Sequence, residues 1–545
     1  MDGLKASIIG FLSERTVPSV RTLLSTRQPL VWLLALTIGT IGAYAILLFR
    51  WLIGQVQWLW LGHDGENYLA TFASFREPWV IMASLIGGGL VVGLILRFAT
   101  VSHRTHGIAD VIEARAIHGS NIPLKRGRTS AFVSAISLGA GASAGREGPA
   151  VHLGATIASF LERQFNLPAA ARRVLLACGA AAAVSASFNA PIAGVLFAHE
   201  VILAHYALSA FVPTVIAAVI ATLITRVHLG DFPAFIVPEY HIASYWEFPA
   251  FALLGIVCGL VAVGFLLSAM ATDWASQRIN LPVWLRPVLG GALVGSIAIF
   301  VPEVIGVGYD ATNQALREKY TLVFLFVLLF AKTAATAITL ASRFGGGVFS
   351  PSLYLGAMAG GAFGIIAASV FPAYASSYGV YAILGMGAVA GAVLGAPIST
   401  AMIVFELTGG YEMTIALLLS VSISSMIMQA LIGQSFFGWQ LSTRGLYLGD
   451  GPHRRIMRTW KVAEFMTDLT PEDAGGPAEL APDDLRLTPE DTLEVALRAF
   501  DSTGDTRIAV FDPNDMARQI GWADYTKAVT TFNAALIEAN VEEHR

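Results

Sequence analysis

The chain carries the same pattern of turn residues twice, and this internal repeat constrains its fold more than any other feature. The first copy runs from Pro149 to Glu200 and the second from Pro351 to Glu406. In each copy a glycine stands five residues after the first proline, an Ala-Pro pair follows 42 or 46 residues after that proline, and a glutamate lies nine residues beyond the pair. Such duplication is typical of transporter folds, which bury their substrate site where two repeats meet and build it from helices broken by Gly and Pro.

The composition places most of the chain in a lipid bilayer. Hydrophobic residues make up 55% of the sequence, charged residues 13%, and the mean hydropathy is +0.64, outside the range of soluble proteins. Several apolar runs approach the roughly 20 residues that span a bilayer: 30–49, 79–98, 208–227, 248–270, 286–301, 322–340 and 411–432. Others are shorter or interrupted by Gly: 130–142 and 174–205. We therefore predict an all-α polytopic membrane protein with tilted and broken helices.

Charge divides the chain into segments. Residues 1–28 show helical patterning with four basic residues and predict a cytoplasmic amphipathic helix, not a cleavable signal. A transmembrane domain is expected at 29–450. The basic juxtamembrane linker 451–461 follows it, so the positive-inside rule places both termini in the cytoplasm. Residues 1–461, the linker included, carry a net charge of +8 and residues 462–545 a net charge of −12, which predicts a separate, soluble, acidic tail.

The acidic tail reads as a small α/β unit. It opens with a loop rich in Pro, Asp and Gly at 470–485. Periodicity and turn residues then predict four elements in this order: helix 490–501, strand 506–511, strand 518–522 and helix 524–539.

Four loop-to-helix junctions carry the chemistry: 106–110, 145–149, 187–191 and 345–351. Glycines allow tight turns there, and Pro149 suits the first position of a helix, where its missing N–H costs nothing. The free amides and the positive dipole of a helix N-terminus bind anions. Permeating chloride fits such a site, because several partial charges hold an anion without a lysine that would bind it too tightly.

Glu147 stands among these positive helix ends and is a candidate gate. An ionised carboxylate there would occupy an anion site and, once protonated, could leave it. Acids within a membrane are costly and indicate function by default. The alternative is a structural salt bridge between Glu147 and Arg146 at a helix end.

Three of the motifs resemble the signature sequences of the CLC family of chloride channels and proton-coupled chloride antiporters. They are Gly-Arg-Glu-Gly-Pro at 145–149, Ser-Phe-Asn-Ala-Pro at 187–191 and Gly-Gly-Val-Phe-Ser-Pro at 346–351. The likeness spans about 30–450. It implies a homodimer of two independent pores, each formed by an inverted repeat of tilted helices, here about 79–230 and 286–432, with anions held by backbone amides.

The resemblance also implies roles for individual residues. Glu147 matches the external gating glutamate, and Val348 and Phe349 match the amide donors of the central anion site. The full set of candidate anion-binding residues is His106, Gly107, Ile108, Arg146, Glu147, Gly148, Val348, Phe349 and Phe437.

Two departures from the family pattern affect this site. His106 stands where the family has the central-site serine, and Phe437 stands where it has the pore tyrosine. His106 could donate one N–H to an anion or carry a charge, and the unperturbed pKa of histidine, about 6.5, would make transport pH-sensitive. A helix-capping or packing role is the alternative. Phe437 can narrow the pore but cannot donate a hydrogen bond.

A third departure concerns proton coupling. Val201 replaces the internal proton-relay glutamate of the antiporters, which favours a channel or a weakly coupled transporter. His199 and Glu200 are titratable neighbours, and a water wire could use either. Alternatively, Glu200 is a structural acid paired with a cation. For Glu406, the equivalent residue of the second repeat, an ion-pair role is favoured over a role in transport.

The tail contains segments that resemble the CBS modules of some CLC proteins, which bind adenine nucleotides. These segments are 462–467, 487–489 and 520–524. The tail has only about 85 residues, which suggests one reduced module that pairs across the dimer. The family's ribose-contacting aspartate falls near Lys527 instead of Asp524, so a structural or dimer-stabilising tail is favoured over nucleotide binding.

Three functions remain open on these grounds: a passive anion channel, a proton-coupled antiporter and a non-conducting anion or nucleotide sensor. We expect chloride as the ion and no cofactor, and the partners expected are a second copy and the lipid bilayer, without nucleic acid. Enzymatic motifs were not found, and Cys178 and Cys258 lie in apolar runs and indicate neither a disulfide nor a metal site. From the resemblance to the CLC family and from the reduced tail, we expect the protein to lie in the bacterial inner membrane.

Overall fold

The computed structural model describes residues 27–544, with gaps at 66–67, 118, 232–234, 236–237, 239, 373, 409–410, 447–452, 454–455, 458–459, 470–485 and 514. The predicted N-terminal helix, most of the basic linker and the loop 470–485 therefore lie largely or wholly outside the described residues. The chain divides into two compact units, Met1–Phe437 and Gly438–Arg545, which are described separately.

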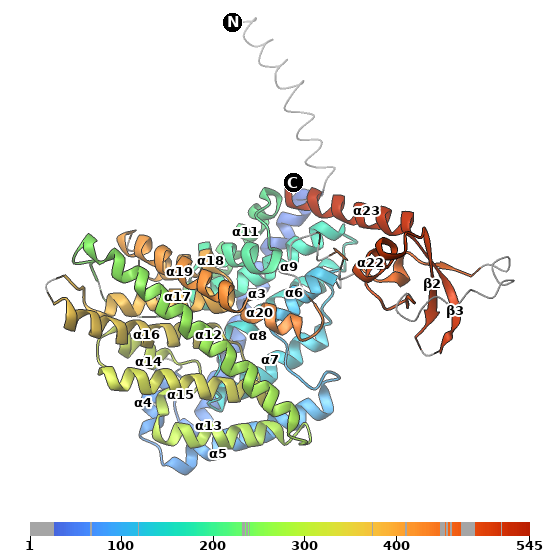
Figure 1. Ribbon diagram of the computed structural model, residues 1–545. Coiled ribbons are helices and arrows are strands. Elements are labelled where there is room, and N and C mark those ends of the chain that lie inside the picture. Colours follow the sequence, from blue (N-terminus) through green and yellow to red (C-terminus); the bar gives the residue numbers. More distant parts are fainter. Residues whose placement is uncertain are drawn as a thin grey trace, which may run out of the picture. The chain divides into compact units, whose positions relative to one another are not determined.

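The first unit is a bundle of helices of very unequal length (Figure 1). Its first half contains α3 (Gln28–Leu61), α4 (Leu69–Ser74), α5 (Pro78–Ala99), α6 (Ile108–Ile117), α7 (Leu124–Gly139), α8 (Glu147–Glu162), α9 (Ala169–Phe188), α10 (Pro191–Phe197), the π-helical turn η3 (Ala198–Leu203) and α11 (Leu208–Leu229). Its second half contains η4 (Tyr245–Glu247), α12 (Phe248–Arg278), α13 (Arg286–Phe300), η5 (Pro302–Val304), α14 (Tyr309–Leu316), α15 (Leu322–Ala341), α16 (Phe349–Val370), α17 (Tyr378–Leu394), α18 (Pro397–Thr408) and α19 (Tyr411–Leu431). The short helix α20 (Phe436–Ser442) follows.

Eight helical segments among the described residues are long and apolar enough to cross a membrane, and four shorter apolar helices accompany them. The predicted polytopic all-α class is therefore confirmed. Long runs such as 322–340 became single helices, whereas the Gly-interrupted run 174–205 is divided between α9, α10 and η3.

The helix start at junction 145–149 differs from the prediction by two residues. Helix α8 begins at Glu147, so Pro149 is its third residue and not its first. Helix α16 begins at Phe349 and places Pro351 in the same way. The first four N–H groups of a helix have no intrahelical acceptor, so proline fits the third position as well as the first.

Reciprocal contacts relate the two repeats. Gly145 donates its backbone N–H to the carbonyl of Gly347 at 2.7 Å, and Gly347 donates to Gly145 at 2.7 Å. The two residues form an isolated antiparallel bridge. Contacts in which residue i meets j and j meets i are the mark of a two-fold axis. The two halves are thus arranged as an inverted repeat, with the junctions 145–149 and 345–351 side by side.

Glycines at matching positions bring the helices of each repeat together. A Cβ on Gly179 of α9 would lie 2.3 Å from the carbonyl oxygen of Gly154 on α8. In the second repeat, a Cβ on Gly356 of α16 would lie 2.2 Å from the carbonyl oxygen of Gly385 on α17. Small residues allow such backbone contact between helices in membranes. The repeated spacing of glycines in the sequence therefore reflects helix packing as well as turns.

The second unit contains a three-stranded antiparallel sheet in the order β1-β3-β2 (Figure 1). Its elements are η6 (Val462–Glu464), β1 (Thr467–Asp468), α22 (Leu493–Thr503), β2 (Arg507–Asp512), β3 (Asp515–Asp524) and α23 (Tyr525–His544). The four predicted elements are all present in the predicted order. Phe465, Phe500 and Val510 lie in the core that the helices and the sheet share. This small α/β unit is consistent with a reduced CBS-like tail.

Candidate functional site

Glu147 is the first residue of α8, and its side chain is fully buried. Its Oε1 accepts hydrogen bonds from the Tyr309 hydroxyl at 3.0 Å and from the Ser350 hydroxyl at 2.5 Å. Its Oε2 is buried and has no hydrogen-bond partner among the residues that the structure describes. Hydrogen bonds to an ionised acceptor are among the strongest in proteins, so two hydroxyls hold this carboxylate in place.

The carboxylate lies where the first turns of α8 and α16 meet. A Cβ on Gly145 would lie 2.6 Å from Oε2 of Glu147 and 3.1 Å from the backbone nitrogen of Ser350. A Cβ on Gly148 would lie 3.2 Å from the Cα of Gly347. Helix α16 has no side-chain cap at its N-terminus. Two positive helix ends thus surround Glu147, as an anion site of this kind requires.

Arg146 and Phe349 connect the junction 187–191 to this centre. The guanidinium of Arg146 donates to the carbonyl of Ser187 at 3.1 Å and lies 5.1 Å from the centre of the Tyr309 ring. The Phe349 ring is 5.0 Å from that of Phe188. The structure therefore brings Arg146, Glu147, Gly148, Val348 and Phe349 together around one junction.

Phe437 is buried at the start of α20. Among the contacts that the structure describes, its ring packs edge to face against Phe436, with centroids 6.3 Å apart. The aromatic ring thus has a packing role at this point in the chain.

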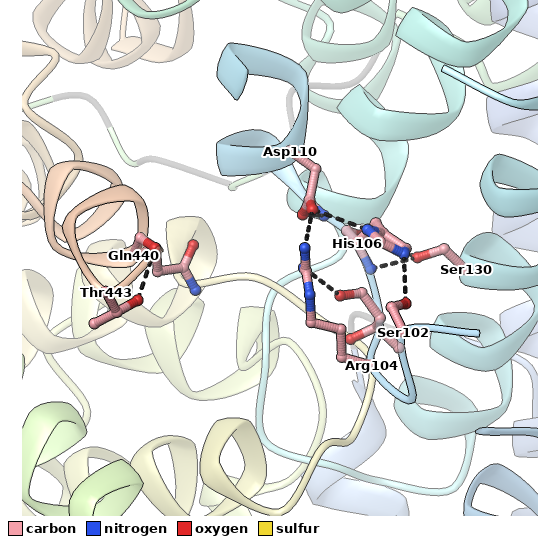
Figure 2. A network of polar contacts seen from close by, with 9 residues as sticks. Ser102, Arg104, His106, Asp110, Ser130, Gln440 and Thr443 are labelled. Carbon is pink, nitrogen blue, oxygen red and sulfur yellow. Dashed lines mark hydrogen bonds and ion pairs between the residues drawn. The ribbon is translucent and has the colours of Figure 1, made fainter. Parts of the chain in front are cut away.

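His106 belongs to a separate polar network at the start of α6 (Figure 2). Its ring Nδ1 lies 2.8 Å from Oδ1 of Asp110, and its Nε2 lies 3.1 Å from the Ser102 hydroxyl. Arg104 donates to the same Asp110 oxygen at 2.6 Å. Both ring nitrogens are therefore engaged with protein groups, which favours the capping alternative for His106 over direct anion binding.

The backbone of the first junction is tied into the same network. The N–H of His106 donates to the Ser130 hydroxyl at 2.8 Å, and that hydroxyl donates to the His106 carbonyl at 3.0 Å. Gly107 donates its N–H to Oδ2 of Asp110 at 2.9 Å, and Ile108, the first residue of α6, is buried. Asp110 therefore caps the helix start that the sequence indicated as an anion site.

A pocket of about 180 Å³ opens beside this network. His106 lines it together with three cationic side chains, Arg104, Lys125 and Arg126. The pocket is therefore suited to collect small anions.

Glu200 and Glu406 each cap a helix of the opposite repeat. The carboxylate of Glu200 accepts the backbone N–H groups of Ile398 at 3.0 Å and Ser399 at 2.7 Å, in the first turn of α18. The carboxylate of Glu406 accepts those of Ile192 at 3.0 Å and Ala193 at 2.7 Å, in the first turn of α10. Helix N-termini thus take the place of the cations that we expected as partners, because the free amides already carry positive charge.

His199 lies in η3 and is buried. Its Nδ1 is 3.0 Å from the carbonyl of His205, and its Nε2 is 3.3 Å from the Thr214 hydroxyl. Both candidates for an inner proton route, His199 and Glu200, are therefore held in structural hydrogen bonds.

We expect Glu406→Ala to lower the free energy of unfolding by about 2 kcal/mol, because it removes two charge-assisted bonds to a helix N-terminus. Thermal unfolding of the detergent-solubilised protein measures the loss. Glu406→Gln keeps one acceptor oxygen and should lose about half as much. Equal stabilities of the wild type and the alanine variant would contradict the cap.

The tail residues near the expected nucleotide position have structural partners. Asp524 accepts the N–H of Lys527 at 3.2 Å and so caps α23. The ammonium of Lys527 donates to the Thr467 hydroxyl at 2.9 Å. These contacts agree with a structural tail.

Asp524 predicts a pH dependence of the tail's stability. The bond from the Lys527 N–H, and secondly that from Arg507, lower the pKa of Asp524 below its ordinary value of 3.8. The unfolded tail therefore binds more protons, so this stabilisation is present above the ordinary pKa and is lost as the pH falls through the folded pKa. Asp524→Asn keeps a cap but not the charge. Between about pH 5 and about pH 3 the variant's tail should lose less thermal stability than the wild type; equal losses would refute this origin.

Sequence reasoning missed several residues of the site. Tyr309 contacts Glu147 from 162 positions away, so no local pattern could reveal it. Ser350 lies inside the third motif and could have been named. Lys332 is a fully buried cation in α15 that donates to the carbonyls of Val304 and Gly306, both at 2.9 Å. Its position inside an apolar run was a signal of function.

Comparison with known proteins identifies the family. A model of the voltage-gated chloride channel family matches residues 88–429. The chain belongs to the CLC family. A ClcB-like chloride channel protein of Ralstonia nicotianae is 33% identical over 387 residues, which cover 70% of this chain and 90% of that protein.

Solved structures agree with this CLC assignment. A crystal structure of a slow cyanobacterial chloride/proton antiporter has a TM-score of 0.67 and 22% identity, and covers 76% of this chain and 97% of its own. A eukaryotic CLC transporter has a TM-score of 0.66 and 17% identity, and covers 91% and 97%. At these identities the likeness shows the fold. The chain is thus an integral membrane protein of a family of chloride channels and transporters, and the resemblance of its motifs is confirmed.

Proposed function

We propose that this CLC protein moves chloride across the membrane through a path gated by Glu147, as a pH- or voltage-sensitive channel or a weakly coupled transporter. The observation that carries the proposal is the buried Glu147 carboxylate between the N-termini of α8 and α16. The amides of Gly148, Val348 and Phe349 would receive the anion when the carboxylate leaves. The proposed path requires no cofactor.

Proton-coupled antiport is the second candidate. One structural relative is a chloride/proton antiporter, and the intact Glu147 is the titratable group that coupling needs. Val201 and the structural bonds of Glu200 count against a strongly coupled mechanism. A homodimer in a bacterial inner membrane, with both termini in the cytoplasm and a tail that stabilises the dimer, completes the proposal.

Reconstitution in chloride-loaded vesicles tests both candidates. Chloride efflux and external pH are recorded together for the wild type and for Glu147→Gln, which cannot titrate. Chloride efflux without linked proton movement supports a channel, and proton uptake against its gradient supports coupling. A wild type that moves no chloride, in vesicles where the protein is folded, would refute the proposed function and leave a sensor as the remaining reading.

A further inference from the structure

His152 is a buried histidine on α8 that no part of the proposed chloride path uses. Its side chain is 1% exposed, and neither ring nitrogen has a hydrogen-bond partner among the residues that the structure describes. Buried polar atoms are nearly always hydrogen-bonded, and an unsatisfied one indicates an ordered water. We therefore expect water next to both nitrogens of His152.

The His152 ring stacks on the ring of His106. Their centroids are 5.4 Å apart and their planes differ by 18°. His106 in turn contacts Asp110 (Figure 2). It also lines the 180 Å³ pocket, so the stacked pair extends from the interior of α8 to an opening. Neither nitrogen of His152 has a hydrogen-bond partner among the described residues, so no direct bond joins the two rings and the proposed transfer needs water between their edges.

Glu147 lies on the same helix, five residues before His152. The rise of an α-helix separates them by about 7.5 Å along its axis. Among the described residues, the buried Oε2 atom of Glu147 has no hydrogen-bond partner, like the nitrogens of His152. Two titratable groups that need water thus occupy successive depths of α8, about 140° apart around its axis, so the water that joins them has to pass round the helix. The pair of His106 and Asp110 adds a third group toward the pocket.

Burial, more than any neighbouring charge, disfavours a proton on His152. Asp110 on α6 attracts such a proton, whereas a protonated His106, Arg126 on α7 and Arg104 before α6 repel it. The protonated form of such a ring is short-lived, so the ring can pass a proton on but does not retain it. Slow throughput of this kind agrees with weak coupling.

We propose that His152 and His106 form a proton route between Glu147 and the basic pocket. This route would replace the one through the position that Val201 occupies. The inference rests on the proposed function in its weakly coupled form. A proton that leaves the Glu147 carboxyl through water binds one nitrogen of neutral His152 and gives an imidazolium. Loss of a proton from the other nitrogen, through water to His106 and Asp110, gives a neutral ring in its other tautomer. The ring returns to the first tautomer by rotation or by proton exchange with water before the next transfer. The same steps run in reverse for the opposite flux.

The experiment measures protons moved per chloride in vesicles with the wild type, His152→Gln and His228→Gln. Glutamine keeps hydrogen-bonding capacity but cannot titrate. His228, an exposed histidine bonded to the carbonyl of Ile224 in its own helix, is the matched control. We expect His152→Gln to lower the proton-to-chloride ratio at least tenfold, with chloride flux still measurable, and His228→Gln to keep the wild-type ratio.

A second variant guards against misfolding at His152. Asp110→Asn keeps a helix cap but removes the carboxylate of the route, and should lower the same ratio. Size-exclusion chromatography and thermal unfolding confirm that each variant is folded. An unchanged ratio in folded His152→Gln overturns the route. Wild-type chloride flux without proton flux also overturns it and leaves the proposed chloride path intact, whereas absence of chloride flux refutes the proposed function itself.

Discussion

Gly179→Leu is expected to prevent the first repeat from folding. The first side-chain atom would lie 2.3 Å from the carbonyl oxygen of Gly154 and 2.6 Å from its carbonyl carbon. Both atoms belong to the backbone of α8, so no side chain can move aside and the two helices must separate. Overpacking alone costs about 1–3 kcal/mol, and the larger leucine adds to this. The expected result is a loss of monodisperse protein on size-exclusion chromatography.

The repeat provides a parallel test and the sequence a matched control. Gly356→Leu should fail in the same way, because its Cβ would lie 2.2 Å from the carbonyl oxygen of Gly385. Gly264 in α12 has no atom within 4 Å of the corresponding position, so Gly264→Leu should yield folded protein. Folded Gly179→Leu at wild-type yield would show that α8 and α9 are not packed as described.

Tyr309→Phe is expected to accelerate chloride flux. The Tyr309 hydroxyl donates to Glu147 at 3.0 Å, and a hydrogen bond to a charged group contributes about 1.5–3 kcal/mol. Without it the ionised carboxylate competes less well with chloride for the junction, by about tenfold or more. Chloride turnover in vesicles should therefore rise, by about tenfold or more where opening of the gate limits the rate.

Tyr354 offers a matched control for this variant. Its hydroxyl is buried one helical turn after Ser350 and has no hydrogen-bond partner among the described residues. Tyr354→Phe removes the same atom without touching Glu147 and should leave chloride turnover near that of the wild type. Equal turnover of Tyr309→Phe and Tyr354→Phe would show that the tyrosine bond does not hold the gate.

Local signals accounted for much of this protein. Six of the seven apolar runs of bilayer length correspond to candidate spanning helices, whereas 286–301 formed the shorter α13 and the spans α9 and α16 were not predicted. The tail's periodicity indicated α22, β2, β3 and α23. The prolines and glycines marked the junctions, although Pro149 proved to be the third residue of its helix because the first turn begins at Glu147. Residues close in sequence decide these features, so the sequence suffices to predict them.

The contacts that define the site were decided only by tertiary structure. Tyr309 and Ser350 reach Glu147 across 162 and 203 positions, and His152 meets His106 across two helices. Glu200 was expected to pair with a cation and instead caps α18. The sequence by itself determined the family, the repeat and the position of the acid at the junction. The partners of that acid depend on how the two repeats pack, because helical periodicity relates only residues within about four positions of one another.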